Sequence, residues 1–194
     1  MPYEAKEIEE RWQSFIKIAN GLLGELGSKF TPTPKGHIQT DIAAAGSLSG
    51  LMILQETVPN LMDITKKSGP GRGPGNVILS EVYEGQNDIF RFLTGMLIGN
   101  GIEDKTDMSI IKNQKPFYEC EEMTRRLSAN FYELCSTQKI EHKYYKFAAA
   151  LAGFKLVMGG KGTKILDPLI GQNILVYYVV AGSKTIPYSE ALWK

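Results

Sequence analysis

Apolar residues recur at helical intervals along most of this chain. In residues 8–26, 80–100 and 117–137 they follow one another at three- and four-residue steps. One face of an α-helix has this period, whereas a half-buried strand alternates at every second residue. The first stripe consists of Ile8, Trp12, Phe15, Ile16, Ala19, Leu22, Leu23 and Leu26. The pattern therefore predicts an all-α protein.

Three further segments complete a bundle of about six main helices. Helices are predicted at residues 37–57 and 141–158, and a sixth begins at Asp167-Pro168, because an N-cap followed by proline is a common helix start. Residues 174–180 of that last helix read ILVYYVV, a β-branched and aromatic run that by itself also fits a strand. We expect these residues to be helical because of the repeat described next.

The order of features in residues 4–102 recurs in residues 116–188. Each half has an alanine-rich helix, then a basic glycine-rich stretch (GPGRGPG or GGKGTK), then a helix that carries Gly-Gln-Asn. A unit of three amphipathic helices cannot bury its apolar face alone. We therefore expect two related halves that pack across a pseudo-twofold axis as one domain, with the polar residues 101–115 as the linker.

The repeated amide pairs are the first candidate binding residues. Glycine and two amides within an apolar helix are costly unless the amides find partners. In one interpretation the amides bond to the backbone and fix the helix crossing. In the other, they converge at the axis on a polar ligand, which glycine lets approach closely. The four residues are Gln86, Asn87, Gln172 and Asn173.

The glycine-rich stretches supply two basic candidates, Arg72 and Lys161. Each precedes a helix start, where backbone amides bind anions, so both are candidate ligands for a small anion. The alternative is a solvated connection with a mobile basic residue. Neither stretch is a P-loop, because the spacing and the preceding strand are missing.

Metal and cofactor sites find little support in the sequence. His37 and Asp41, four residues apart, fit one face of a helix, but the repeat partner of Asp41 is Lys146. Both histidines, His37 and His142, are expected near helix starts as ordinary polar residues. Cys120 and Cys135 fall on one predicted helix, about 22 Å apart, too far for a disulfide. We therefore predict no metal, no cofactor and reduced thiols.

Charge and hydropathy restrict the partners. The chain has 22 basic and 21 acidic residues and a net charge of +1. A dedicated nucleic-acid binder carries a basic face that neutralises phosphates, and no such face is evident. The longest apolar run is about half of what a bilayer requires, and the acidic N-terminus lacks a signal-peptide core. We expect a soluble cytoplasmic protein without nucleic-acid or membrane partners.

One stretch resembles a known family. Residues 83–91, YEGQNDIFR, are similar to a segment of the C-terminal helical domain of acyl-CoA dehydrogenases, which reads aromatic-Glu-Gly-Thr-Asn-Glu/Asp-Ile-x-Arg. The resemblance implies that Glu84 stands where many members have the catalytic base that removes the α-proton of an acyl thioester. Gln86 departs from the Thr or Ser of the family, and a chain of this length has no counterpart of the flavin-binding and β-barrel regions.

These features favour a binding protein over an enzyme. The helices at 141–158 and 168–182 are apolar on nearly all sides, so each is either central in the domain or part of a subunit interface. We therefore expect a non-catalytic helical protein that binds a partner or a small polar ligand and forms a homodimer. The alternative is an enzyme, or an enzyme subunit, with Glu84 as its base.

Overall fold

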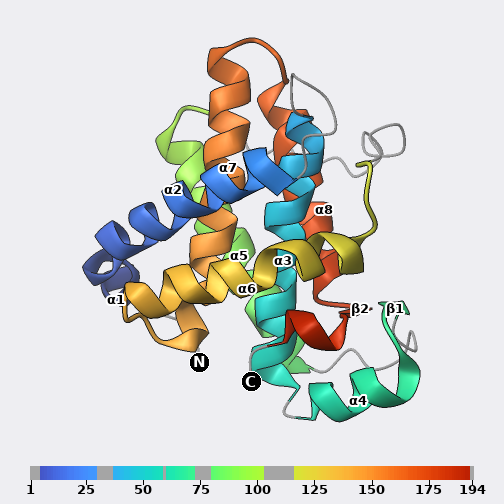
Figure 1. Cartoon of the computed structure of the whole chain (residues 1–194). Coiled ribbons are helices and arrows are strands. Elements are labelled where there is room, and N and C mark those ends of the chain that lie inside the picture. The colour runs from blue at the N-terminus through green and yellow to red at the C-terminus, as the bar shows by residue number, and fades with distance from the viewer. Residues whose placement is uncertain (1–4, 30–36, 59, 73–79, 103–115, 193–194) are drawn as a thin grey trace.

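The structure is a computed structural model that describes residues 5–29, 37–58, 60–72, 80–102 and 116–192. These residues form eight α-helices and a two-stranded bridge (Figure 1). The prediction of an all-α bundle is confirmed. In chain order the elements are α1 Ala5–Glu10, α2 Trp12–Lys29, α3 Ile38–Thr57, α4 Leu61–Ser68, β1 Gly71–Arg72, α5 Ser80–Gly99, α6 Cys120–Thr137, α7 Tyr145–Gly162, α8 Pro168–Gly182 and β2 Thr185–Ile186.

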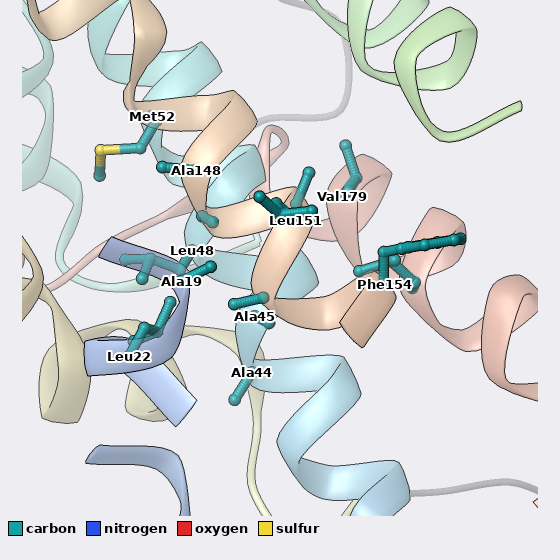
Figure 2. Packing of buried hydrophobic residues seen from close by; sticks show 14 of the residues in the cluster. Ala19, Leu22, Ala44, Ala45, Leu48, Met52, Ala148, Leu151, Phe154 and Val179 are labelled. Carbon is teal, nitrogen blue, oxygen red and sulfur yellow. The ribbon is translucent and has the colours of Figure 1, made fainter. Parts of the chain in front are cut away.

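Helices α3 and α7 form the centre of the bundle and run antiparallel (Figure 1). Both are buried around most of their circumference, as their alanine-rich sequences require. Helix α8 lies along α3 in the same direction, α2 and α6 cross over the pair, and α5 packs against α3 and α7. In Figure 2, Ala44, Ala45 and Leu48 of α3 point towards the neighbouring helices α2 and α7, which contribute Ala19 and Leu151.

Glycine lets α3 and α8 approach until their backbones touch. A Cβ atom at Gly46 would lie 2.7 Å from the carbonyl oxygen of Leu175, and one at Gly50 would lie 2.6 Å from the amide nitrogen of Ser183. On α8, Gly182 meets the backbone of Ser47 in the same way. This close contact fixes how far along α3 the eighth helix sits.

The segment that follows α8 closes the lower end of the fold. β2 pairs antiparallel with β1, so that Arg72 is opposite Thr185. A short 3₁₀ turn, Ser189–Ala191, comes next. The hydroxyl of Tyr132 on α6 donates to the carbonyl oxygen of Ala191 at 2.9 Å. These contacts tie the end of the described chain to α4 and α6.

The helix predictions hold with three differences. Residues 174–180 lie within α8, so the helical interpretation of ILVYYVV is confirmed. Helix α4 was not predicted; its eight residues make only about two turns between loops, too few for a sustained apolar repeat along the sequence. The first stripe is divided at Arg11 into α1 and α2. Helix α7 continues through Gly162, because the packing of Gly160 against Ile38 and Leu166 outweighs the low helix propensity of glycine.

The internal duplication stays a prediction. Helix α2 packs on α7 and α6 packs on α3, as a pseudo-twofold axis between the halves would require. The contact of α8 with α3, however, is far more extensive than that of α5 with α7. Most of the predicted linker, residues 103–115, lies outside the described residues. None of the described helices combines the length and apolar character needed to cross a membrane.

Candidate functional site

The first Gly-Gln-Asn segment is where α5 docks onto the rest of the bundle. A Cβ atom at Gly85 would lie 2.7 Å from a methyl carbon of Ile53 on α3, so glycine is needed for the close fit. The Gln86 amide is buried and donates to the hydroxyl oxygen of Ser183, at the end of α8, at 2.6 Å. Asn87 is exposed. Gln86 thus joins α5 to the end of α8, through a side-chain hydroxyl and not through the backbone partner that the structural interpretation expected.

The four repeated amides do not converge on one site. Gln172 and Asn173 are buried near the start of α8, whereas Gln86 bonds to Ser183 at the other end of that helix. Eleven residues of helix separate Gln172 from Ser183, which corresponds to about 16 Å at roughly 1.5 Å per residue. The structure therefore does not bring the four amides together, because Gln86 meets the C-terminal end of α8 whereas Gln172 and Asn173 lie in the first half of that helix.

The two basic candidates are also far apart. Arg72 belongs to β1, which pairs with the strand that follows α8. Lys161 is exposed in the last turn of α7, close to the connection that leads into the start of α8. The expectation that Lys161 lies in a flexible glycine loop is corrected, because α7 continues to Gly162. A small anion could not contact both residues.

Glu84 lies on the solvent-exposed side of α5. It is one helical turn from Asp88 and shares its exposed stripe with Asn87 and Arg91. An active-site base that removes a carbon-bound proton works in a closed pocket that excludes water. The exposure of Glu84 gives the resemblance to acyl-CoA dehydrogenases no further support, and its catalytic role stays a prediction.

A buried ion cluster joins α3, α5 and α7. The Lys146 side chain is 3% exposed, and its Nζ atom lies 2.9 Å from Oε2 of Glu56 and 4.0 Å from Oδ2 of Asp88. Burial raises the pKa of the Asp88 carboxyl, although the nearby Lys146 and Arg91 oppose this. With two carboxyl groups beside one ammonium, the cluster has no net positive charge with which to bind an anion. The cluster therefore acts as a connection between three helices.

Sequence reasoning missed this cluster. The visible signal was a lysine at the start of the helix YYKFAAALAGF, which is otherwise apolar on every side. A charge at such a position is retained only when a partner of opposite charge accompanies it into the interior. The sequence does not indicate which carboxylates these are, since Glu56 and Asp88 come from helices far away along the chain.

A second polar network holds the start of α3 at the other end of the bundle. His37 is the N-cap of α3, and its Nδ1 atom accepts the amide hydrogen of Thr40 at 3.2 Å. The same Nδ1 lies 2.7 Å from the Thr40 hydroxyl, which in turn accepts the amide hydrogen of Phe117 at 3.2 Å. The His37 and Phe117 rings are in contact, with centroids 4.4 Å apart. One threonine thus links the helix start to the segment that enters α6.

This end of the bundle presents large apolar side chains to solvent. Phe117 is 59% exposed and Ile165 is 71% exposed. Ile165 lies at this end because its amide donates to the carbonyl oxygen of Gly160, and Gly160 packs on Ile38 at the start of α3. The exposed Lys161 and Lys164 precede Ile165 in the chain. We call this surface the Phe117 face; it consists of His37, Phe117, Lys161, Lys164 and Ile165.

Two acidic residues border the Phe117 face. Asp41, in the first turn of α3, is half-buried, and burial raises the pKa of its carboxyl to about 6. Glu119, two residues after Phe117, is exposed at the N-cap of α6. Among the described residues, no group of three His, Cys, Asp or Glu side chains is placed to hold a metal ion.

Comparisons with known proteins found no relative of this chain. The chain matches no protein-family model, no curated protein sequence and no solved structure.

Proposed function

We propose that this chain is a non-catalytic, partner-binding helical protein and that it forms a homodimer through the Phe117 face. The observation that carries the proposal is the exposure of Phe117, at 59%, and of Ile165, at 71%, at the same end of the bundle. The Phe117 backbone and ring are held by Thr40 and His37, so the aromatic side chain is presented in a fixed position. Such anchored aromatic residues carry much of the binding energy of interfaces.

The charges around this face favour a second copy of the chain as the partner. Lys161 and Lys164 precede Ile165 by four residues and one residue, Asp41 follows His37 by one helical turn, and Glu119 follows Phe117 by two residues. A twofold-symmetric interface places the same patch of both subunits together, so a patch that carries both signs can be complementary to itself. The net charge of +1 adds no strong repulsion between copies.

The fold favours the Phe117 face as the dimer interface over α7 and α8, the apolar helices from which the sequence suggested a dimer. The apolar sides of helix α7 are buried against α2, α3, α5 and α8 within one chain. Helix α8 uses most of its apolar surface against α3. Their composition therefore requires no subunit contact.

Sedimentation equilibrium across a wide range of concentrations tests the proposal. We expect the wild type to be a dimer and Phe117→Ser to dissociate at least about tenfold more readily, as removal of an interface anchor does. Ile98→Ser is the control, because Ile98 is 63% exposed on α5, which contributes no residue to the Phe117 face. A wild type that stays monomeric, or a Phe117→Ser variant that dimerises normally, would reject the proposed interface.

A further inference from the structure

The chain contains two asparagine-glycine steps, in different structural settings. Asn20-Gly21 lies near the middle of α2, and Asn100-Gly101 directly follows the last residue of α5. Asparagine before glycine is the pair most prone to deamidation, because glycine has no side chain to shield its amide nitrogen. Asn20 and Asn100 are both exposed. The two steps therefore share their chemistry and their access to water, and they differ in the backbone that holds them.

Deamidation is a reaction between neighbouring groups of the chain. The amide nitrogen of the glycine attacks Cγ of the asparagine, and the new N–Cγ bond closes a five-membered succinimide ring. The Cγ–Nδ2 bond breaks, and the nitrogen leaves as ammonia with the proton of the glycine amide. Water then opens the ring at either carbonyl and yields aspartate or isoaspartate. In a helix the glycine amide points back along the axis to a carbonyl oxygen, so the attack requires the helical backbone to open.

At Asn100-Gly101, only the end of one helix holds the reacting groups. Gly101 has a φ of +68°, and its amide donates to the carbonyl oxygen of Ile98 at 3.0 Å. The Asn100 side-chain Nδ2 atom donates to the carbonyl oxygen of Met96 at 2.7 Å. These bonds close the C-terminal turn of α5 in a Schellman arrangement. End turns open at a low cost in free energy, so the glycine nitrogen and the asparagine Cγ can meet without unfolding of the bundle.

At Asn20-Gly21, the packing of three helices holds the reacting groups. A Cβ atom at Gly21 would lie 2.6 Å from a methyl carbon of Leu134 on α6, and the adjacent Leu22 is fully buried. Oδ1 of Asn20 accepts a hydrogen bond from the Lys155 ammonium group on α7. The Gly21 amide becomes free only when the middle of α2 separates from α6 and α7. Such an opening approaches the free energy of global unfolding.

We propose that Asn100 is a site of spontaneous deamidation, that this modification irreversibly weakens the C-terminal cap of α5, and that the fold protects Asn20. The carboxylate product cannot donate to the Met96 carbonyl oxygen, and its charge lies at the negative end of the helix dipole. Isoaspartate adds a methylene group to the backbone, which disrupts the 3.0 Å bond from the Ile102 amide to the Leu97 carbonyl oxygen. Both of these apolar side chains are buried, so an open cap exposes apolar surface.

This inference is independent of the proposed homodimer, because α5 contributes no residue to the Phe117 face. Peptide mass spectrometry after incubation of the intact chain tests it. One sample stays folded and a second is unfolded in guanidinium chloride, both in the same mildly alkaline buffer. In the folded sample, we expect Asn100 to be converted at least about tenfold faster than Asn20, because an end turn opens far more readily than a packed helix. In the unfolded sample the two should be converted at similar rates.

Conversion is detected as the mass gained when an amide becomes a carboxyl group, and chromatography separates aspartate from isoaspartate. Asn100→Gln is the control: it keeps a side-chain amide but needs a slower six-membered ring, so its peptide should stay unconverted while Asn20 behaves as in the wild type. The proposal is overturned if Asn100 stays intact in the folded protein while it is converted in guanidinium chloride. Equal conversion of Asn20 and Asn100 in the folded protein overturns it as well.

The effect on the cap has its own readout, amide hydrogen exchange in Asn100→Asp. This variant carries the aspartate product from the start. We expect the protection of the Ile102 amide to fall about two- to fivefold relative to wild type, as an unfavourable charge at a helix end implies. Amides in the middle of α7 serve as the internal reference. Unchanged protection of Ile102 would overturn the weakening of the cap.

Discussion

Gly46 of α3 faces the carbonyl oxygen of Leu175 on α8 so closely that a Cβ atom on the glycine would lie 2.7 Å from that oxygen. The obstacle is backbone, which cannot rotate away as a flexible side chain does. We expect Gly46→Ala to lower the free energy of unfolding by about 2–4 kcal/mol, because α8 must move away from α3. Urea denaturation followed by circular dichroism measures this change.

Gly24→Ala is the matched control for that variant. Gly24 is exposed in α2, and a Cβ atom there would meet no heavy atom within 4 Å. Alanine should raise the free energy of unfolding by up to about 1 kcal/mol, through its higher helix propensity. Equal effects of the two substitutions would contradict the close contact of α3 with α8.

The buried pair of Lys146 and Glu56 makes a second prediction. Glu56→Gln leaves the Lys146 ammonium buried without its nearest carboxylate and should cost about 2 kcal/mol of stability. Lys146→Met removes the charge that needs a partner. The double variant should therefore be more stable than Glu56→Gln alone, which a double-mutant cycle measures. Strictly additive losses would indicate that the two side chains do not interact.

Asp41 makes a prediction about pH. Burial raises the pKa of its carboxyl to about 6, above the ordinary value of 3.8, so the folded state binds this proton more tightly than the unfolded state does. The Asp41 contribution to stability is therefore greatest below pH 3.8 and is lost as the pH rises through about 6. Asp41→Asn should stabilise the protein relative to wild type by about 1–2 kcal/mol at pH 7.5, and less at pH 4.5. Urea titrations of both proteins at the two pH values test this; an advantage that grows in acid would contradict it.

Two neighbours on α5 should respond differently to substitution. Gln86→Ala leaves the buried Ser183 hydroxyl without its donor and should cost about 1–3 kcal/mol. Glu84→Gln changes an exposed side chain and should alter stability by less than about 0.5 kcal/mol. Thermal unfolding of the two variants makes the comparison. A large loss in Glu84→Gln would mean that Glu84 has a buried partner.

The fold could be predicted from the sequence wherever the information was local. Apolar spacing located α2, α3, α5, α6, α7 and α8, and the Asp167-Pro168 start was correct, since Asp167 accepts the Leu169 amide hydrogen. Helix α4 was not predicted because it makes only about two turns, and the last turn of α7 was missed because it depends on packing rather than on propensity.

The sites depended on contacts between distant residues, and little of them could be predicted. The structural role of Gln86 was foreseen as one of two alternatives, but its partner Ser183 is 97 residues away. The four repeated amides do not meet at one site. The sequence could not show this, because it does not indicate at which end of α8 the helix α5 packs. The Phe117 face could not be predicted from the sequence, since the position of Phe117 depends on its bond to Thr40, which is 77 residues away along the chain.

Cross-linking within a mixed sample tests the proposed homodimer most directly. Isotopically heavy and light copies are combined, treated with a short lysine-reactive cross-linker and digested for mass spectrometry. We predict heavy-to-light links among Lys161 and Lys164, and none that join Lys66 and Lys67, which lie on α4 outside the Phe117 face. Links between copies that avoid Lys161 and Lys164, or no links between copies at concentrations where a dimer should form, would contradict the account.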